Sequence, residues 1–514
     1  MSVAEGSRAD QKILTIDELS QRVADLKAAG KRVVLCHGVF DLLHYGHVLH
    51  LQEAREQGDA LVVTVTPDVY VNKGPNRPVF GEDYRARMIA ALSMVDFTAI
   101  NRWPTAVEAL KLIRPDVYAK GPDYKDPQAD LTGKITEEEA AIVGAGGRAF
   151  YTEAITFSSS NLINRHLSTH SSEVNDYLQE LRGIYTPAQV HDALNGLRSL
   201  RVLLVGEAII DEYVYVDQMG KSSKDPVLAM RYASQERFPG GVLAIANHMA
   251  AFIDQVSLVT FLGSRDSQEP FVRDNLAPNV EPVFFPKKDS PTIVKRRYVE
   301  SYLLQKLFEV YVFNDEFLDD ASDQEFSSWL SQAASGYDLV VVADFGHGIM
   351  TQNAINAVQA ESKFLAINTQ QNAANIGYHT LSRYRRAHFA CTNESELRSD
   401  SRSRLGALEP LVLALARRLG LENALITRGK AGTLFFRPSE GWSRGPAFAQ
   451  TVTDRIGAGD AVLSWTAPMA AAGLPGDMIA FVANIVGAQA AQVVGNRSAV
   501  DRVTTYKIIE SLLK

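Results

Sequence analysis

Two separate stretches of this chain alternate apolar, β-rich segments with segments of helical periodicity. The first starts at Lys31 and reads RVVLCHGVF, HYGHVLHLQEAREQG and DALVVTVTPD, and the second starts at Arg201 with RVLLVGEAIIDEY. A strand, a helix and a strand in succession predict parallel strands with helices packed on the faces of the sheet. We therefore expect an α/β protein with two parallel-sheet domains.

The length of the chain supports the same division. At 514 residues it exceeds what one hydrophobic core accommodates, and two complete enzymes fit within it. We predict a helical extension over residues 1–30, a first domain over 31–167 and a larger second domain over 201–514. Residues 168–200 contain two amphipathic patterns, VNDYLQELRGI and PAQVHDALNGLRSL, which predict a helical linker. No internal repeat is present, so the two domains are expected to be unrelated.

Composition excludes several functional classes. The net charge of −8 argues against a general nucleic-acid binder, which needs surplus Lys and Arg to displace counterions. Only two cysteines occur, Cys36 and Cys391, so neither a disulfide framework nor a Cys-based zinc site is expected. The acidic N-terminus lacks the basic and apolar regions of a signal peptide, and no segment is typical of a membrane span. We expect a cytoplasmic protein.

The sharpest motif of the first half directly follows an apolar strand and has the form G-x-F-D-x-x-H-x-G-H. It contains Gly38, Phe40 and Asp41, followed by His44 and His47. Two histidines three residues apart at the start of a helix lie on one face, and a helix N-terminus favours phosphate. Imidazoles there donate hydrogen bonds to phosphate oxygens on which charge builds up. The motif predicts a triphosphate site.

Other interpretations of the histidine pair exist. An H-x-x-H pair alone is typical of an ordinary helix surface or of part of a metal site. Its position within a G-x-F-D motif after a strand favours catalysis. A zinc site is less well supported, because no third ligand stands at a recognisable spacing.

At these residues the chain resembles the HxGH nucleotidyltransferase superfamily, which includes cytidylyltransferases and the adenylyltransferase half of bifunctional heptose kinase/adenylyltransferases. The resemblance runs from about Arg32 to Arg165 and implies a Rossmann-like domain in which His44 and His47 contact nucleotide phosphates. It implies that the segments KGPNRPVFGEDYRARM, AKGPDYKD and TFSSSNLINR also reach the site. Their candidate residues are Lys73, Arg77, Arg87, Lys120, Asp123, Tyr124, Ser158, Ser159 and Ser160. Outside this pattern, each single lysine or arginine is typical of solvated surface charge.

A second motif stands near the C-terminus, where Gly457-Ala458-Gly459-Asp460 precedes a long apolar helical pattern. Small residues at a helix start let backbone N–H groups surround a γ-phosphate, and an adjacent aspartate can accept the proton of a sugar hydroxyl. The four residues alone are equally compatible with a simple helix cap. The surrounding segments favour an anion hole with Asp460 as catalytic base.

From about Arg201 to the C-terminus, the chain resembles the PfkB, or ribokinase-like, carbohydrate kinases. The segments VGEAIIDEY, RFPGGVLAIAN, PTIVKRRYVE, VVVADFGHG, CTNESE and LITRGKAGTLFF follow in family order. The resemblance implies a three-layer α/β/α domain and is strongest to the heptose kinase half of the bifunctional enzyme, with the two halves in the opposite order. It places Asp211, Gly240, Gly241 and Asn247 at the sugar, Asn393, Arg428, Gly429 and Gly432 at ATP, and Glu396 at Mg²⁺.

Several positions depart from the family pattern. Glu207 replaces an aspartate, and Ala244 replaces an asparagine for which Asn247 stands one helical turn later. The D-P-x-x segment is replaced by the run Asn368-Thr369-Gln370-Gln371-Asn372, and two threonines before G-A-G-D are replaced by Arg455 and Ile456. These departures bear on sugar specificity and on phosphate and nucleotide handling, while Asp460 is retained.

Together the motifs predict a bifunctional sugar-activating enzyme. One half would phosphorylate a sugar or sugar phosphate with ATP, and the other would join a sugar 1-phosphate to an NTP, releasing pyrophosphate and an NDP-sugar. The resemblance favours a heptose-like substrate and a homodimer. Mg²⁺ and ATP are the expected cofactors, and a second NTP, either ATP or CTP, is the expected co-substrate.

Two other functions stay open at this point. One half could be catalytic while the other serves as a regulatory or oligomerisation module. The chain could also be a ligand-binding regulator without turnover, although the intact His44, His47 and Asp460 favour catalysis.

Overall fold

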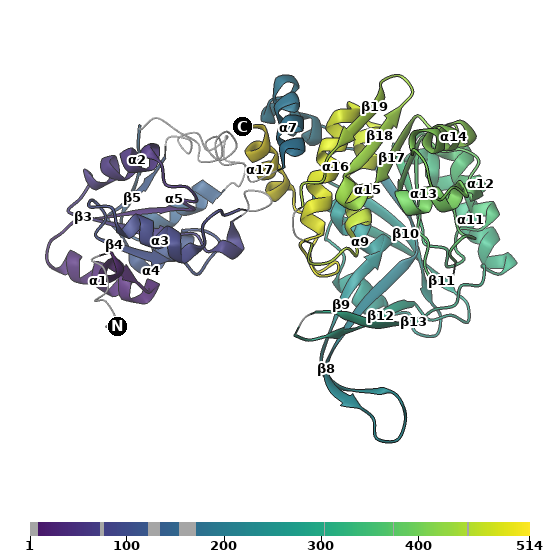
Figure 1. Cartoon of the computed structure of the whole chain (residues 1–514), viewed down its shortest axis with the longest axis horizontal. Coiled ribbons are helices and arrows are strands. Elements are labelled where there is room, and N and C mark those ends of the chain that lie inside the picture. The colour runs from purple at the N-terminus through teal and green to yellow at the C-terminus, as the bar shows by residue number, and fades with distance from the viewer. Residues whose placement is uncertain are drawn as a thin grey trace. The chain divides into compact units, whose positions relative to one another are not determined.

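The structure is a computed structural model of the 514-residue chain. It describes residues 9–71, 77–121, 134–153, 171–302, 304–373, 375–449 and 452–514. The chain divides into two units, Met1–Pro187 with Tyr506–Lys514, and Ala188–Thr505 (Figure 1). This division falls within the predicted linker, at the start of its second helix. No helix in the described ranges is long and apolar enough to cross a bilayer.

The first unit is built on a six-stranded, wholly parallel sheet with the order β1-β4-β3-β2-β5-β6. Its strands are β1 (Ile13–Leu14), β2 (Val33–Gly38), β3 (Ala60–Val65), β4 (Phe97–Ile100), β5 (Val117–Lys120) and β6 (Arg148–Tyr151). Its helices are α1 (Ile16–Ala28), α2 (Tyr45–Arg55), α3 (Glu82–Ala90), α4 (Val107–Ile113), α5 (Lys134–Gly144) and α7 (Ser172–Ile184). The predicted Rossmann-like architecture is confirmed.

Of the residues predicted as an N-terminal extension, the described ones from Ala9 onward are built into this unit. β1 pairs with β4 at the edge of the sheet, and Thr15 and Glu18 form a capping box that starts α1. The helix then places Ile16, Leu19 and Val23 in the core on one face of the sheet. Their spacing of three and four residues gives the helix its apolar face.

The second unit contains a nine-stranded sheet with the order β11-β10-β7-β14-β15-β16-β17-β18-β19. Its strands are β7 (Val202–Gly206), β10 (Val256–Gly263), β11 (Val280–Lys287), β14 (Leu339–Asp344), β15 (Leu365–Thr369), β16 (Phe389–Asn393), β17 (Asn423–Thr427), β18 (Thr433–Arg437) and β19 (Gly441–Gly445). It is parallel from β11 to β17, and β18 and β19 continue it antiparallel.

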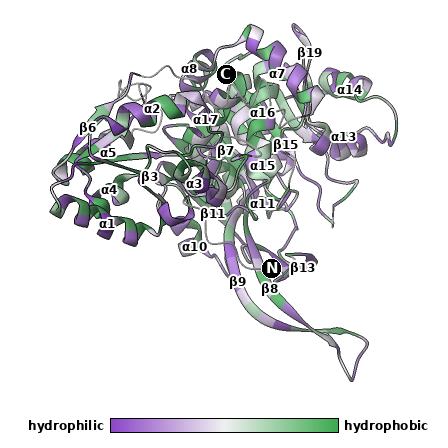
Figure 2. Ribbon diagram, turned by 60° about the vertical axis from the view of Figure 1, so that its left-hand side comes forward, coloured by the Kyte–Doolittle hydropathy of each residue, from purple (hydrophilic) through white to green (hydrophobic). Residues whose placement is uncertain are grey.

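Helices cover both faces of this sheet, which confirms the predicted three-layer arrangement. One face packs on α11 (Asp320–Ala333), α12 (Gln352–Glu361), α13 (Glu394–Asp400) and α14 (Glu409–Leu419). The other packs on α9 (Val242–Ala250), α15 (Ala458–Ala471) and α16 (Gly476–Ala490). This unit also contains α8 (Pro187–Asn195) and α10 (Glu269–Asp274). The C-terminal helix α17 (Arg502–Leu513) begins in this unit, and its residues from Tyr506 onward belong to the first unit. Apolar strands therefore lie between helical layers, as the colouring of Figure 2 shows.

A separate four-stranded sheet with the order β13-β12-β8-β9 was not predicted. It consists of β8 (Ala208–Lys221), β9 (Leu228–Gly241), β12 (Ile293–Glu300) and β13 (Lys306–Val312). The long β8–β9 hairpin extends away from the nine-stranded sheet (Figure 1). β7 and β8 are separated by Glu207 alone, so the sequence shows one apolar run where the structure has strands in two sheets.

Candidate active sites

In the first unit, His44 and His47 lie together at the start of α2. His44 is the N-cap, and its Nδ1 accepts a hydrogen bond from the Gly46 backbone N–H at 3.1 Å. The His47 Nδ1 lies 3.4 Å from the backbone nitrogen of His44, which donates to it. With Nδ1 accepting, each neutral ring carries its proton on Nε2 and is a donor there. The rings stack with centroids 3.9 Å apart, so the two donors lie side by side at a helix N-terminus.

The glycine and phenylalanine of the motif shape the approach to these rings. Phe40 has a positive φ of 48°, and its ring meets His47 edge-on at 5.4 Å. A Cβ atom on Gly38 would lie 3.2 Å from the Phe40 ring. Glycine at position 38 therefore lets the phenylalanine fold back onto the histidine pair.

The aspartate of the motif forms a buried ion pair. Arg77 donates from Nε to Asp41 at 2.5 Å, and the Val79 backbone N–H donates to the other carboxylate oxygen at 2.5 Å. The Arg77 Nη2 is buried and has no hydrogen-bond partner among the described residues. A guanidinium held by a carboxylate with one donor left over is suited to contact an anionic ligand.

Lys120 lies at the end of β5 and is buried, with its Nζ 2.8 Å from Glu138. Burial, and secondarily the charge of Lys120, lowers the pKa of His37 and that of His50 to about 4. His37 contacts Thr64 and Thr66, and His50 contacts Thr152. Both histidines therefore stay neutral. His37 joins the end of β2 to the end of β3, and His50 joins α2 to the residue that follows β6.

Arg87 differs from Arg77 in its surroundings. It is exposed on α3, and its guanidinium lies 3.7 Å from Asp10. Arg85, two residues earlier, is instead fully buried and donates to Val39, Thr66 and Asp68. The structure thus does not bring Arg87 to the histidine pair. The candidates Lys73, Asp123, Tyr124, Ser158, Ser159 and Ser160 lie outside the described residues.

In the second unit, the Gly-Ala-Gly-Asp motif starts α15. Gly457 is the N-cap with φ 81°, and a Cβ atom there would lie 2.0 Å from the Asn496 side chain, so only glycine fits. Asp460 is 7% exposed, and its Oδ1 accepts from the Gln370 Nε2 at 2.5 Å. Burial raises the pKa of Asp460 to about 7. A carboxyl with this pKa is suited to proton transfer near neutral pH. Gly459, by contrast, faces open space.

The turn before this motif is held by Asp454. Its carboxylate accepts from the Tyr213 hydroxyl at 2.8 Å, from the Lys306 Nζ at 2.5 Å and from the backbone N–H groups of Ile456 and Gly495. Asp454 therefore joins the turn to strands β8 and β13.

The predicted sugar residues lie partly together. Asp211 on β8 is buried and paired with Arg297 at 2.5 Å. Gly240 lies beside it on β9, where a Cβ atom would approach the Asp211 Oδ2 to 2.3 Å. Gly241 has a positive φ of 56° and starts α9. Asn247 on α9 lies apart from them, because its amide bonds the backbone of Asn275 and Ala277.

Lys295 on β12 is a site residue that the sequence reasoning did not single out. Burial lowers its pKa, while the charges of Asp211, Glu207 and Asp460 act in the opposite direction. Lys295 is therefore a partly buried cation whose charge interacts with the carboxylates of this site. The sequence did contain a signal for this residue. Lys295 and Arg297 stand two residues apart in the PTIVKRRYVE segment, so on a strand they lie on the same face.

The predicted ATP residues lie at the ends of β16 and β17. Asn393 caps α13 in a capping box with Glu396, whose carboxylate also accepts from Thr392 at 3.0 Å. Burial raises the pKa of Glu396. Arg428 begins the tight turn between β17 and β18, which contains Gly429 (φ 55°) and Gly432 (φ 76°). Arg428 donates to Glu394 at 3.3 Å.

Glu207, where an aspartate was expected, has a defined role. It accepts the backbone N–H groups of Phe345 at 2.9 Å and His347 at 3.0 Å. Burial, and secondarily the charge of Asp344, raises its pKa to about 7. The longer side chain thus joins the loop after β7 to the turn after β14, both at the carboxyl edge of the sheet where ligands bind in this architecture.

Comparison with known proteins matches each unit to a family. Residues 199–502 match the pfkB family carbohydrate kinase model, and residues 35–165 match the cytidylyltransferase-like model. Phosphofructokinase-2 of Escherichia coli in complex with potassium superposes with a TM-score of 0.51 at 16% identity, covering 61% of this chain and all of that one. This likeness concerns the fold of the second unit.

Curated relatives match over shorter regions. The Bifunctional protein HldE of Pelobacter propionicus is 38% identical over 171 residues, which are 32% of this chain and 33% of that protein. The protein of the same name from Methylobacillus flagellatus is 44% identical over 119 residues, which are 23% of this chain and 24% of the relative. The chain thus spans about a third or less of the length of these relatives. The pfkB match covers more than half of the chain, and so the protein belongs to the pfkB family of carbohydrate kinases, with a cytidylyltransferase-like domain that precedes the kinase domain in the sequence.

Proposed function

We propose that the chain is a bifunctional sugar-activating enzyme, with an ATP-dependent sugar kinase in the second unit and a sugar 1-phosphate nucleotidyltransferase in the first. The observation that carries the proposal is the presence of two separate sets of phosphate-directed groups at helix N-termini. One is Asp460 at the start of α15, and the other is the His44–His47 pair at the start of α2. The curated relatives carry the name "bifunctional", which agrees with two activities.

In the kinase step, Asp460 accepts the proton of a sugar hydroxyl while the oxygen of that hydroxyl attacks the γ-phosphorus of ATP. The bond between the γ-phosphorus and the bridging oxygen breaks, and ADP leaves. The backbone N–H groups of Gly457, Ala458 and Gly459 surround the transferring group. Asp211 and Lys295 act electrostatically on Asp460 and would orient the acceptor.

Magnesium is the expected metal of the kinase site, and Glu396 fits it. Its two oxygens accept from Thr392 and from the backbone N–H groups of Asn393 and Gln371. A carboxylate has about four lone-pair sites, so capacity for an ion remains. Glu396 would hold Mg²⁺ together with nucleotide phosphates, and the ion would neutralise charge on the transferring group.

In the nucleotidyl step, a sugar 1-phosphate oxygen attacks the α-phosphorus of an NTP, and pyrophosphate leaves. The Nε2–H groups of His44 and His47 donate to phosphate oxygens, and Arg77 and Lys120 supply positive charge at the same end of the sheet. The co-substrate is ATP or CTP. If the kinase acts at the anomeric hydroxyl of a sugar already phosphorylated elsewhere, a separate phosphatase must act between the two steps. The motif resemblance favours a heptose-like sugar.

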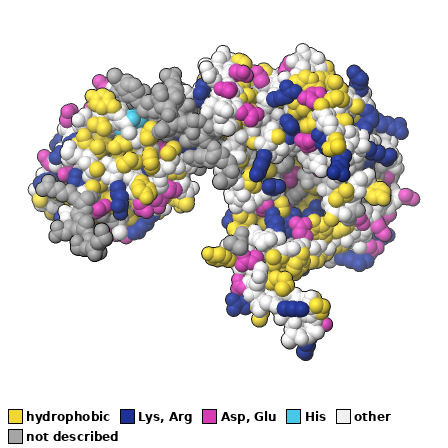
Figure 3. Space-filling view, in the orientation of Figure 1, with side chains coloured by type: hydrophobic (Ala, Val, Ile, Leu, Met, Phe, Trp, Pro, Cys, Tyr) yellow, Lys and Arg dark blue, Asp and Glu magenta, His cyan; other side chains and the backbone are white. Residues whose placement is uncertain are grey.

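We also propose that the enzyme is a cytoplasmic homodimer. The cytoplasm is favoured because its two cysteines are unpaired thiols. The dimer is favoured because the four-stranded sheet has an exposed apolar surface. Exposed side chains there are Val227, Leu228, Tyr232, Phe308 and Val310. Several border a groove of about 930 Å³, and Figure 3 shows hydrophobic side chains gathered over this sheet. An apolar patch of this kind is typical of an interface between copies.

The test is a mass-spectrometric screen of the intact protein with sugars, sugar phosphates and the four NTPs, in the presence of Mg²⁺. A phosphorylated sugar and an NDP-sugar with pyrophosphate are the expected products. One product without the other would support a single active half. Binding of nucleotides without any product would support the regulator.

A further inference from the structure

The carboxylate of Asp460 meets a side-chain amide that the family pattern does not provide. Gln370 follows β15 in the Asn-Thr-Gln-Gln-Asn run and donates from Nε2 to the Asp460 Oδ1 at 2.5 Å. Asp460 is buried, so this contact is made away from bulk water, where a hydrogen bond to a charged group is strong.

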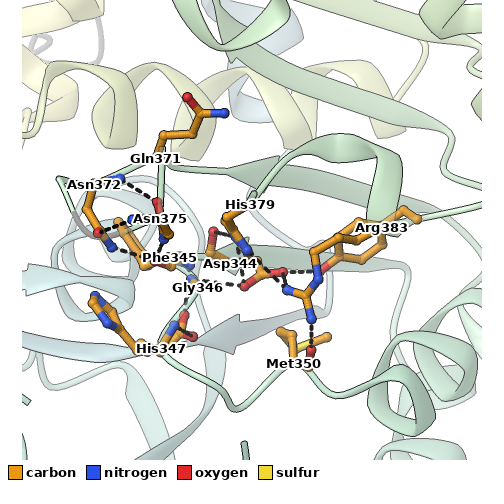
Figure 4. A network of polar contacts seen from close by, with 12 residues as sticks. Asp344, Phe345, Gly346, His347, Met350, Gln371, Asn372, Asn375, His379 and Arg383 are labelled. Carbon is orange, nitrogen blue, oxygen red and sulfur yellow. Dashed lines mark hydrogen bonds and ion pairs between the residues drawn. The ribbon is translucent and has the colours of Figure 1, made fainter. Parts of the chain in front are cut away.

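The loop that carries Gln370 is held in place by its own contacts. The Gln370 backbone N–H donates to the Asp344 carbonyl at 3.0 Å. Asn372 and Asn375 accept each other's backbone N–H groups at 2.7 and 3.2 Å, and both side-chain amides donate to the Phe345 carbonyl (Figure 4). The loop is therefore fixed against the turn after β14.

That turn is itself anchored by Asp344. Its carboxylate accepts from Arg383 at 2.8 Å and from Tyr384 at 3.0 Å, and it lies 3.2 Å from His379 (Figure 4). Arg383 also donates to the Met350 carbonyl. Because this network is well connected and rests on the buried Asp344, the backbone that carries Gln370 is held in place before substrate binds.

The neighbouring glutamine has a different contact. The Gln371 side chain donates to Ser399 at 2.9 Å, and its backbone N–H donates to Glu396. The two adjacent glutamines thus point to different elements, α15 and α13. Gln371 supplies a matched control for any change at position 370.

We infer that Gln370 is a positioning residue of the kinase site, whose amide holds one oxygen of the Asp460 carboxylate so that the other oxygen faces the acceptor hydroxyl. This inference rests on the kinase activity proposed above. It assigns a role to the segment that replaces the family's D-P-x-x sequence.

The hydrogen bond from Gln370 can be followed through the pKa of Asp460, which depends on the groups around this carboxylate. Burial raises the pKa of Asp460, and the Gln370 hydrogen bond lowers it. Asp211 from β8 and Glu396 from α13 raise this pKa further, and Lys295 from β12 lowers it. The Cys391 thiol of β16 is buried, with a pKa raised far above its ordinary value, and stays neutral. A substitution at position 370 therefore changes one contribution to the pKa of Asp460, while the contributions of Asp211, Glu396 and Lys295 stay the same.

Two variants shift that balance in opposite directions. Gln370→Met removes the donor at similar length, so the pKa of Asp460 should rise by about one unit. Gln370→Lys replaces the amide with a cationic donor, so this pKa should fall by about one unit. A purely structural role for Gln370 predicts no such opposite shifts.

The experiment follows Asp460 directly in the full chain. Protein labelled with ¹³C at aspartate Cγ is titrated by NMR, the Asp460 resonance is assigned by its absence in Asp460→Asn, and folding of each variant is checked by circular dichroism. We expect opposite pKa shifts in Gln370→Met and Gln370→Lys and the wild-type titration in Gln371→Met. An Asp460 resonance that titrates at the same pH in wild type and both Gln370 variants would overturn the inference.

Kinetics then separate this inference from the proposed function. In Gln370→Met we expect kcat for sugar phosphorylation to fall about tenfold or more, with KM for ATP unchanged and the acid limb of the pH profile displaced upwards. If the NMR shifts appear but the wild-type chain phosphorylates no sugar, the contact stands and the kinase proposal fails. Equal kcat values in wild type and Gln370→Met in an active enzyme would contradict positioning.

Discussion

Arg77 and Asp41 form a buried ion pair, with the Arg77 Nε 2.5 Å from the Asp41 carboxylate. Asp41 belongs to the loop before the histidine pair, and Arg77 comes from the segment after β3, so the pair ties together two parts of the predicted triphosphate site. Because each charge is buried, either one left alone is costly.

Arg77→Met should destabilise the first unit by about 3–5 kcal/mol, because the buried Asp41 side chain loses its ion-pair partner. Nucleotidyl transfer should be lost, while sugar phosphorylation continues. The measurement is thermal unfolding of the full chain with both activities assayed in parallel. As a control, the double variant Asp41→Asn/Arg77→Met should regain part of the lost stability. Equal stability of wild type and Arg77→Met would contradict the pairing.

The pH dependence of sugar phosphorylation follows from Asp460, whose pKa burial raises to about 7. A general base acts in its deprotonated form, so kcat/KM should rise with pH through about 7 and fall about tenfold per pH unit below it. Glu207 titrates in the same range, because burial raises its pKa to about 7 as well. The acid limb should therefore persist in Glu207→Gln, measured at saturating MgATP. Disappearance of the limb in that variant would assign it to Glu207 instead.

Metal removal should stop both reactions. The kinase motif offers few cations, so charge on the transferring phosphoryl group needs Mg²⁺ more directly there than in the first unit, which has Arg77 and Lys120. EDTA should abolish sugar phosphorylation and nucleotidyl transfer, and excess Mg²⁺ should restore both. Glu396→Gln should raise the Mg²⁺ concentration needed for half-maximal sugar phosphorylation. Full kinase activity in excess EDTA would contradict the metal assignment.

The two domains should fold separately, since the linker carries no core strand. We expect residues 1–167 and residues 186–514 each to give a soluble, cooperatively folded protein. The structure adds that Arg182 of α7 donates to the Leu512 carbonyl of α17 at 3.0 and 2.8 Å. A chain starting at Ser171 should therefore unfold with a free energy about 1–2 kcal/mol larger than one starting at Thr186. Fragments that are soluble only when expressed together would contradict the predicted boundaries.

Much of the fold could be predicted from the sequence, because strands buried on both faces are continuous apolar runs. The strands predicted in RVVLCHGVF and DALVVTVTPD match β2 and β3, and the helix predicted over HYGHVLHLQEAREQG contains α2. The four-stranded sheet could not be found in this way. β8 follows β7 after one residue, and which sheet a strand joins depends on long-range pairing with β9 and β12.

The candidate sites, too, could be predicted from the sequence only where local spacing determines the geometry. Short motifs placed His44, His47 and Asp460 at helix starts, because spacing within one turn fixes local geometry. Gln370 bonds Asp460 and Lys295 acts on it electrostatically, from segments about 90 and 165 residues away, and no local pattern encodes such long-range relationships. Asn247 satisfied a helical spacing argument, yet its amide is engaged by the Asn275–Ala277 backbone, because the spacing does not say which neighbour a helix face meets.

The central claim is that one chain carries two independent active sites, and a pair of variants tests it most directly. Asp460→Asn and His47→Ala are assayed for sugar phosphorylation and for pyrophosphate release from an NTP and a sugar 1-phosphate, with folding checked by circular dichroism. Asp460→Asn should lose about 10²–10⁴-fold in phosphorylation and keep nucleotidyl transfer near wild type, and His47→Ala should show the reverse. Loss of both activities in either folded variant, or unchanged nucleotidyl transfer in His47→Ala, would contradict the account.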